Sequence, residues 1–324
     1  MMDMSHLPPV LRHLALPVIA SPMFTVSYPE LVLAQCKAGI VGSFPALNAR
    51  PPELLDEWLG QMKEELAQYQ SANPSLPVGP IAVNQIVHDS NVRLTQDVQT
   101  CVKHQVPIFI TSLRAPVREV IDAVHSYGGI VLHDVINMRH AAKALEAGVD
   151  GLIVVAAGAG GHAGTLSPFA LVGEVRRHYS GPVILSGAIA TGGAILAAQA
   201  MGADLAYIGT RFIASTEANA VQMYKEAVVR AKASDIIYTN YFTGVLGNYI
   251  RESIERAGLD PTNLPQPEKG MNFSSGTSKA KSWTQIWGAG QGAGQIDDII
   301  PVAEIIMRLK DEYEVARRRV GAGL

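Results

Sequence analysis

Eight short apolar runs alternate with helix-like stretches between residues 14 and 214, and this alternation restricts the fold more than any other feature. The runs are apolar throughout, which is typical of strands in a parallel sheet with both faces covered. They are PVIAS (17–21), GIVGS (39–43), PIAVN (80–84), PIFITS (107–112), GIVLHD (129–134), GLIVVA (151–156), PVILSG (182–187) and DLAYIGT (204–210). Eight strands separated by helices predict an α/β fold, a TIM (β/α)8 barrel. A doubly wound sheet is the alternative, but it usually has a Gly-x-Gly-x-x-Gly turn where this chain has VIASPMF.

The part of the chain after residue 214 predicts an addition to the barrel. We expect residues 14–214 and 284–324 to form the barrel with a closing C-terminal helix, and residues 215–283 to form a helical cap or lid. The polar, turn-rich stretch 261–283 has a length that is typical of active-site lids. Lys279 and Lys281 in this stretch are either a solvated charge pair or contacts to an anionic substrate.

Charge and composition exclude several classes of protein. The 324 residues carry 26 Lys and Arg against 29 Asp and Glu, so the net charge is −3, with no electrostatic footprint for nucleic acid or an acidic membrane. Apolar runs of about 18 residues are missing, and the N-terminal stretch lacks the apolar region of a signal peptide. We therefore expect a cytoplasmic protein that binds neither nucleic acid nor membranes. The oligomeric state stays open, and a homodimer is one alternative.

The cysteines and histidines show no metal-ligand spacing. The two cysteines, Cys36 and Cys101, lie far apart in helix-like stretches, which argues against a disulfide framework. We expect no metal site.

Barrel enzymes place their active site at the carboxyl ends of the strands, so the residues that end each run are the candidate site residues. Pro22 would stiffen its turn, and the amide of Asn84 offers both a donor and an acceptor. His133 is predicted to lie in a mouth loop as a contact to cofactor or substrate. The candidates from the first, third and fifth runs are Ala20, Pro22, Met23, Asn84 and His133.

The last two runs end in sequences that predict a phosphate site. SGAIATGG (186–193) and IGTRF (208–212) follow consecutive late strands, where barrels commonly bind phosphate. Glycines let backbone N–H groups approach an anion without interference from a Cβ atom, and the N-terminus of the following helix favours negative charge. The candidates are Ser186, Gly187, Ala188, Gly209 and Thr210.

A single histidine lies within the glycine-rich stretch VVAAGAGGHAG (154–164). Gly160 and Gly161 precede His162 and leave room for a planar partner, and an ordinary imidazole pKa of about 6.5 suits proton transfer near neutrality. We predict that His162 is catalytic. Trp287 and Gln291 lie in a second glycine-rich segment that returns to the barrel, where either core packing or a place at the site would explain them.

Taken together, LPVIASPM (16–23), VN (83–84), AGAGGHAG (157–164), SGAIA (186–190), YIGTRF (207–212) and WGAGQGAG (287–294) resemble the nitronate monooxygenase family, formerly called 2-nitropropane dioxygenases. The resemblance covers residues 14–214 and resumes at the last of these motifs. It implies an enzyme that converts alkyl nitronates and O2 into carbonyl compounds and nitrite.

The resemblance also implies the cofactor and its contacts. FMN would be bound non-covalently, with its phosphate on Ser186, Gly187, Gly209 and Thr210. Its ring would lie near Met23, Asn84 and the backbone of Gly160 and Gly161. His162 stands where the family has its catalytic base or substrate-orienting group.

Three positions depart from the family pattern and leave the substrate open. Val155 stands where the family often has a hydrogen-bonding side chain, and Gly158 where some members have an acidic residue. Asp134 stands where some quinone-reductase relatives have a basic residue. Fewer polar contacts to the flavin would follow.

Two other functions compete with nitronate oxidation. The nearer one is an FMN reductase that uses NAD(P)H to reduce a quinone or an enoyl thioester. The other is a flavin- or phosphate-binding barrel with no activity. Chemistry of the IMP dehydrogenase type needs a cysteine after the sixth strand, whereas Cys36 and Cys101 both precede it.

Overall fold

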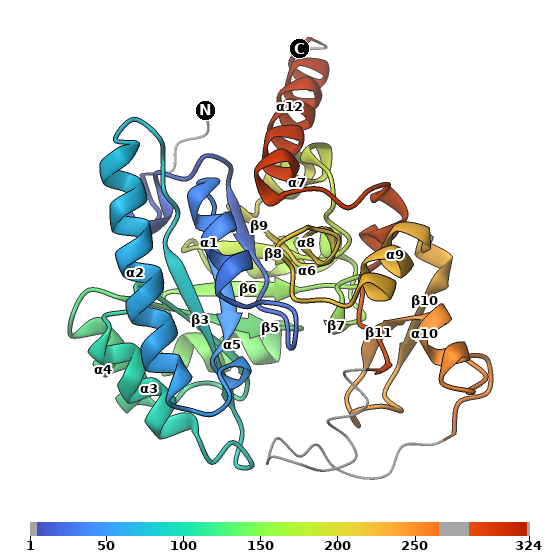
Figure 1. Cartoon of the computed structure of the whole chain (residues 1–324), viewed down its shortest axis with the longest axis horizontal. Coiled ribbons are helices and arrows are strands. Elements are labelled where there is room, and N and C mark those ends of the chain that lie inside the picture. The colour runs from blue at the N-terminus through green and yellow to red at the C-terminus, as the bar shows by residue number, and fades with distance from the viewer. Residues whose placement is uncertain (1–4, 266–284, 323–324) are drawn as a thin grey trace.

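A computed structural model describes residues 5–265 and 285–322, and it contains the predicted (β/α)8 barrel (Figure 1). The parallel sheet has the strand order β1-β9-β8-β6-β5-β4-β3-β2. Its strands are β1 (Val18–Ala20), β2 (Gly42–Pro45), β3 (Ile81–Val87), β4 (Ile108–Leu113), β5 (Ile130–Val135), β6 (Gly151–Val155), β8 (Val183–Ser186) and β9 (Leu205–Ile208). A parallel bridge between Ile19 and Val41, just before β2, brings the two edges of the sheet together.

Helices follow the strands and cover the outside of the barrel. They are α1 (Pro29–Lys37), α2 (Leu54–Ala72), α3 (Leu94–Lys103), α4 (Arg118–His125), α5 (Met138–Ala147), α6 (Pro168–Arg176), α7 (Gly192–Ala200) and the short α8 (Thr210–Ile213). Single-turn helices occur at η1 (Pro9–Leu11) and η2 (Ala46–Asn48). The closing helix α12 (Val302–Gly321) packs on α7 at Gly192, where a Cβ atom would overlap the backbone of Leu309 and Tyr313.

Side chains alternate along each strand between two separate apolar clusters. One cluster fills the barrel interior and includes Ile130 and Leu132 of β5, with Leu7 and Leu11 from the N-terminal segment. The other lies between strands and helices and includes Val131 and Val135 of β5. The parity of a residue in its strand therefore decides whether its side chain faces the barrel interior or the helices.

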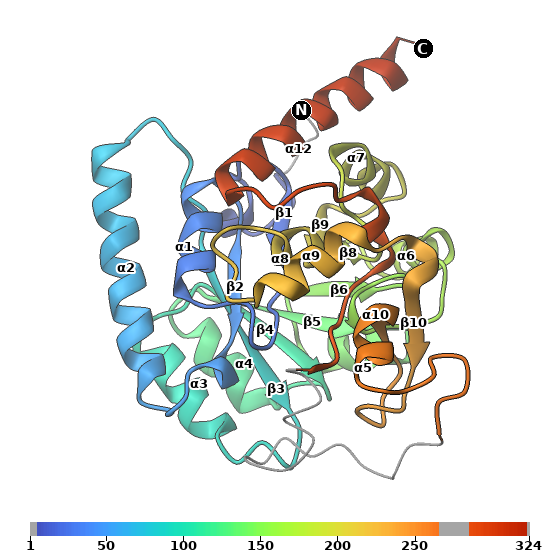
Figure 2. The ribbon, with the colours of Figure 1, turned by 45° about the vertical axis from the view of Figure 1, so that its right-hand side comes forward.

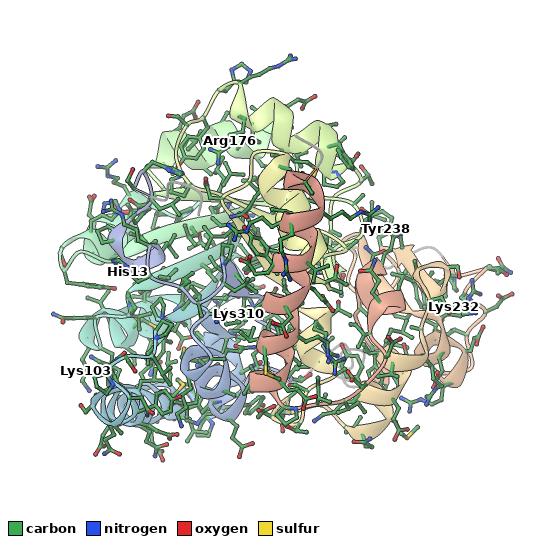
Figure 3. The ribbon with its side chains drawn as sticks, turned by 90° about the horizontal axis from the view of Figure 1, so that it is seen from above. His13, Lys103, Arg176, Lys232, Tyr238 and Lys310 are labelled. Carbon is green, nitrogen blue, oxygen red and sulfur yellow. The ribbon has the colours of Figure 1, made fainter. Side chains whose placement is uncertain are left out.

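The segment after α8 forms a cap at one side of the barrel mouth (Figure 2). It contains α9 (Gln222–Arg230), η3 (Ala233–Asp235), β10 (Ile236–Thr239), β11 (Gly247–Ile250) and α10 (Arg251–Arg256). The cap therefore contains helices, as predicted, and also two strands that the sequence analysis did not predict. β10 and β11 pair antiparallel, and β11 also pairs with β7 (Gly161–His162), a strand from the loop after β6. Viewed from above, Lys232 and Tyr238 of the cap lie across the molecule from His13 and Lys103 (Figure 3).

Lys279 and Lys281 lie outside the described residues, as does most of the stretch 261–283. The limits of the cap as a unit therefore stay a prediction. Within the described part of the chain, no helix combines the length and the apolar character that crossing a membrane requires.

Candidate active site

A cavity of about 360 Å³ opens at the carboxyl ends of the barrel strands and extends under the cap. Its volume falls in the range of small-molecule and cofactor sites. Most of the predicted site residues line it, although they come from distant parts of the sequence. These are Pro22, Met23, Asn84, Gly160, Gly161, His162, Ser186, Gly187, Ala188, Gly209 and Thr210.

Ala20 and His133 do not line the cavity, which corrects their prediction. Ala20 belongs to the cluster between strands and helices. His133 lies inside β5 instead of in a mouth loop, buried, with its Nδ1 2.8 Å from Thr111 Oγ1. Burial lowers the pKa of His133 to about 4. Because β5 continues to Val135, the alternation turns His133 toward the helices and its neighbour Asp134 into the cavity.

Trp287 and Gln291 also lie outside the cavity wall. The Trp287 ring stacks on Tyr224 with 5.1 Å between centroids, and the Arg256 guanidinium lies 3.9 Å from its centroid on another side. Trp287 therefore packs in the core, which is one of the two explanations that the sequence allows. The Gln291 side chain is exposed, and its backbone N–H donates to Gly158 O at 2.9 Å.

The loops after β8 and β9 bring backbone close to the cavity. Gly187 has φ +148°, and a Cβ atom there would lie 2.9 Å from Ala157 O. Ala188 has φ +54°, a left-handed conformation that costs a non-glycine residue about 1 kcal/mol or more. The Thr210 hydroxyl accepts a hydrogen bond from Gly290 N at 2.9 Å and still has its own proton to donate.

The N-terminus of α7 does not serve the site as the sequence predicts. Glu312 of α12 accepts a hydrogen bond from Gly192 N at 2.7 Å, and Thr191 accepts one from Ala194 N. The positive end of α7 is therefore already satisfied by a carboxylate of the closing helix.

Two of the four glycines between β6 and α6, Gly160 and Gly164, pack against backbone atoms of other segments. A Cβ atom on Gly160 would lie 2.8 Å from Gly290 N, and one on Gly290 would lie 2.6 Å from Gly158 O. Gly158 has φ +86°, so an acidic side chain would be strained there. Only Gly161 in this stretch has open space around its Cβ position. The glycines thus let segment 288–292 close against the loop that carries His162.

His162 lies in the cavity wall on β7 and contacts the cap through its ring. Its Nε2 is 3.0 Å from Thr243 Oγ1, and the Thr243 hydroxyl donates its one proton to Val245 O at 3.0 Å. The neutral ring has one protonated nitrogen and one that can accept a proton. Burial lowers the pKa of His162 to about 4, so the ring is neutral near pH 7.

A chain of polar side chains crosses the ends of β3, β4 and β5. Asn84 Nδ2 donates to Ser112 Oγ at 2.8 Å, and Ser112 Oγ donates to Asp134 Oδ2 at 2.8 Å. Burial raises the pKa of Asp134 to about 7, and the hydrogen bond from Ser112 opposes this rise. The cavity thus contains a carboxyl group that the family resemblance did not supply.

The sequence missed several residues that shape the cavity. Asn48 fixes the loop that carries Met23 by donating to Met23 O and Ser27 O and accepting from Thr25 N. Tyr224 of the cap lines the cavity and donates to Gly288 O. Neither residue lies in a recognisable motif. Ser112 and Asp134 do have a signal, because each is the last residue of a predicted strand.

Most of the chain matches the model of a known protein family. The family model described as nitronate monooxygenase matches residues 10–312. The chain belongs to the nitronate monooxygenase family. Nitronate monooxygenase from Paraburkholderia phytofirmans is 26% identical, with 92% of each chain covered. This member of the family is therefore an enzyme, an oxidoreductase of the flavin type.

Solved structures share the fold over almost the whole chain. FabK from Thermotoga maritima has a TM-score of 0.75 at 25% identity, with 97% of each chain covered. Nitroalkane oxidase from Streptomyces ansochromogenes has a TM-score of 0.75 at 23% identity, with 95% of this chain and 98% of that chain covered. The second similarity concerns the fold alone.

Proposed function

We propose that the chain binds FMN at the barrel mouth and oxidises alkyl nitronates with O2 to carbonyl compounds and nitrite. The observation that carries this proposal is the neutral imidazole of His162 in the cavity wall, in a member of the nitronate monooxygenase family. FMN, when bound, would supply the electron transfer between substrate and O2.

The residues at the ends of β8 and β9 suit the phosphate of FMN. Gly187 and Gly209 present backbone without a side chain, and the Thr210 hydroxyl keeps a proton for a phosphate oxygen. Ser186 lies in the cavity wall beside them. Met23 and Asn84 line the remaining part of the mouth, where we place the contacts to the flavin ring.

His162 would act as the proton acceptor or orient the substrate. The hydrogen bond between its Nε2 and Thr243 Oγ1 fixes the ring, and the neutral imidazole has the one unprotonated nitrogen that proton transfer requires. Gly161 has open space around its Cβ position, and both Gly161 and His162 line the cavity in which a substrate would bind. Thr243 would then be a positioning residue that acts through His162.

The proposal is tested by incubating the FMN-loaded protein with an alkyl nitronate in air. We expect nitrite release and O2 consumption that stop when O2 is removed. FMN-loaded protein that releases no nitrite from any of several nitronates, while its spectrum shows bound flavin, would contradict nitronate oxidation and leave FMN binding intact.

An NAD(P)H-dependent FMN reductase acting on a quinone or an enoyl thioester is the second candidate. The enoyl reductase domain of MlnA from Bacillus amyloliquefaciens has the same fold, with a TM-score of 0.68 at 14% identity, and this shared fold keeps the reductase a candidate. Steady oxidation of NADH or NADPH that depends on a quinone or an enoyl thioester would establish this candidate instead.

A further inference from the structure

Asp134 ends the polar chain that begins at Asn84, and nothing in that chain satisfies its second oxygen. The single proton of the Ser112 hydroxyl goes to Asp134 Oδ2, and Ser112 in turn accepts from Asn84. Asp134 Oδ1 is buried, and no residue within 5–265 or 285–322 donates a hydrogen bond to it. The residue lines the cavity, so this oxygen has an unmet hydrogen-bonding capacity at the proposed site.

An ionised carboxylate in this position would be poorly stabilised. Within the described part of the chain, no lysine or arginine lines the cavity, and a buried charge without a partner costs several kcal/mol. The neutral carboxylic acid avoids this cost. Because Oδ2 is the acceptor for Ser112, the acid proton belongs on Oδ1, and Asp134 becomes a hydrogen-bond donor.

The other titratable groups of the cavity wall have pKa values that are shifted away from neutrality. His162 on β7 and His140 on α5 both have pKa values lowered by burial, His140 also by the charges of Arg139 and Lys143. Tyr207 on β9 and Tyr224 on α9 have pKa values raised by burial. Asp134, with its pKa raised to about 7, is the group whose charge changes there.

We propose that Asp134 donates a hydrogen bond from its protonated Oδ1 to an acceptor atom on the ring of the bound flavin. This rests on the proposed binding of FMN. The pyrimidine half of the flavin ring carries carbonyl oxygens and unprotonated ring nitrogens, which are acceptors of the required kind. β5 is separated from β8 by β6, so a flavin with its phosphate at β8 and β9 would extend its ring toward the Asn84–Ser112–Asp134 chain. Ionisation of Asp134 removes the donor and places a negative charge beside the ring.

The test measures the Kd of FMN for the apoprotein by flavin fluorescence between pH 5.5 and 8.5. We expect wild-type binding to be about tenfold weaker at pH 8 than at pH 6, because the protonated acid binds and the carboxylate does not. Asp134→Asn keeps a donor of the same shape that cannot ionise. The Kd of this variant should vary with pH only because the phosphate group of FMN titrates. Dividing the wild-type Kd by the variant Kd at each pH removes this shared contribution.

Two further variants complete the design. Ser112→Ala removes the hydrogen bond that lowers the Asp134 pKa, so the weakening of FMN binding should begin at a higher pH than in wild type. Asp122→Asn changes an exposed carboxylate of α4 that pairs with Arg118, and it should keep the wild-type pH dependence. Ser112→Ala also tests the proposal if Asp134→Asn fails to fold.

The outcomes separate the two proposals. If wild type and Asp134→Asn bind FMN with the same pH dependence, or if Ser112→Ala leaves the pH dependence unmoved, Asp134 is not the donor although FMN binding stands. If wild type binds no FMN at any pH, the proposed function is contradicted, and the role of Asp134 is contradicted with it.

Discussion

Different parts of the fold position the polar groups on two sides of the cavity, the side formed by β3–β5 and the side under the cap. Asn84, Ser112 and Asp134 extend from barrel strands whose parallel ladder fixes them. His162 extends from a strand of two residues, and its partners β11 and Thr243 come from the cap. The barrel itself therefore positions the groups proposed to contact the cofactor. The proposed catalytic group depends on the segment that follows the barrel.

We therefore expect that FMN affinity and catalytic turnover depend on different residues and can be changed independently by substitutions. Changes on the strand side should alter FMN affinity, as proposed for Asp134. Changes under the cap should alter turnover while FMN stays bound.

His162→Ala should lower kcat/KM for a nitronate by about 10²- to 10⁴-fold, because a positioned general base commonly contributes that much. The visible spectrum should still show bound flavin. His178→Ala, at an exposed position near the end of α6, is the matched control and should behave like wild type. Full turnover in His162→Ala would end the catalytic assignment.

Gly290→Ala should destabilise the protein by about 1–3 kcal/mol, because its Cβ atom would lie 2.6 Å from Gly158 O and would push the cap-side segment away. Thermal unfolding measures this change. Gly173→Ala in α6 has open space and an ordinary backbone, so it should stabilise the protein by about 0.5–1 kcal/mol. Equal stability of the two variants would show that segment 288–292 does not pack tightly against the loop.

Thr243→Val should lower kcat about tenfold and leave the Kd of FMN unchanged, because it removes the hydroxyl that hydrogen-bonds to His162 and orients its ring. Thr243→Ser restores the hydroxyl and should restore kcat. If the serine variant is as slow as the valine variant, Thr243 supports the cap by packing and does not act through its hydrogen bond.

The activity of the FMN-saturated wild type should not decline as the pH falls from 7 to about 5, and it should decline toward pH 4. Burial lowers the pKa of His162 to about 4, and only the neutral imidazole accepts a proton. The kcat/KM profile for a nitronate measures this decline. A decline centred near pH 6.5 would show a solvated imidazole, contrary to its burial under the cap.

The barrel could be predicted from sequence because continuous apolar runs and helix patterns are local signals. The glycines after β8 and β9 were also readable, since barrel topology brings those loops together. The position of His133 could not be predicted from these local signals. Its strand runs to Val135, and because side chains alternate, the strand register decided that Asp134 and not His133 faces the cavity.

The cap side could not be predicted for a different reason. Thr243 is 81 residues from His162, and pairing between β7 and β11 leaves no periodic signal in a strand of two residues. The sequence indicates the glycine motif, but it does not indicate that Gly160 packs against Gly290. Gly160 and Gly290 are small because two backbones meet there, which becomes visible only when both segments are placed.

The proposed function requires that this flavin-type enzyme takes its electrons from a nitronate. The most direct measurement is the flavin absorption band of the FMN-loaded protein under anaerobic conditions, first with an alkyl nitronate and separately with NADH or NADPH. We predict that the nitronate bleaches the band and that neither nicotinamide does. Rapid bleaching by NADH or NADPH, with no change on adding the nitronate, would contradict the claim and identify the reductase.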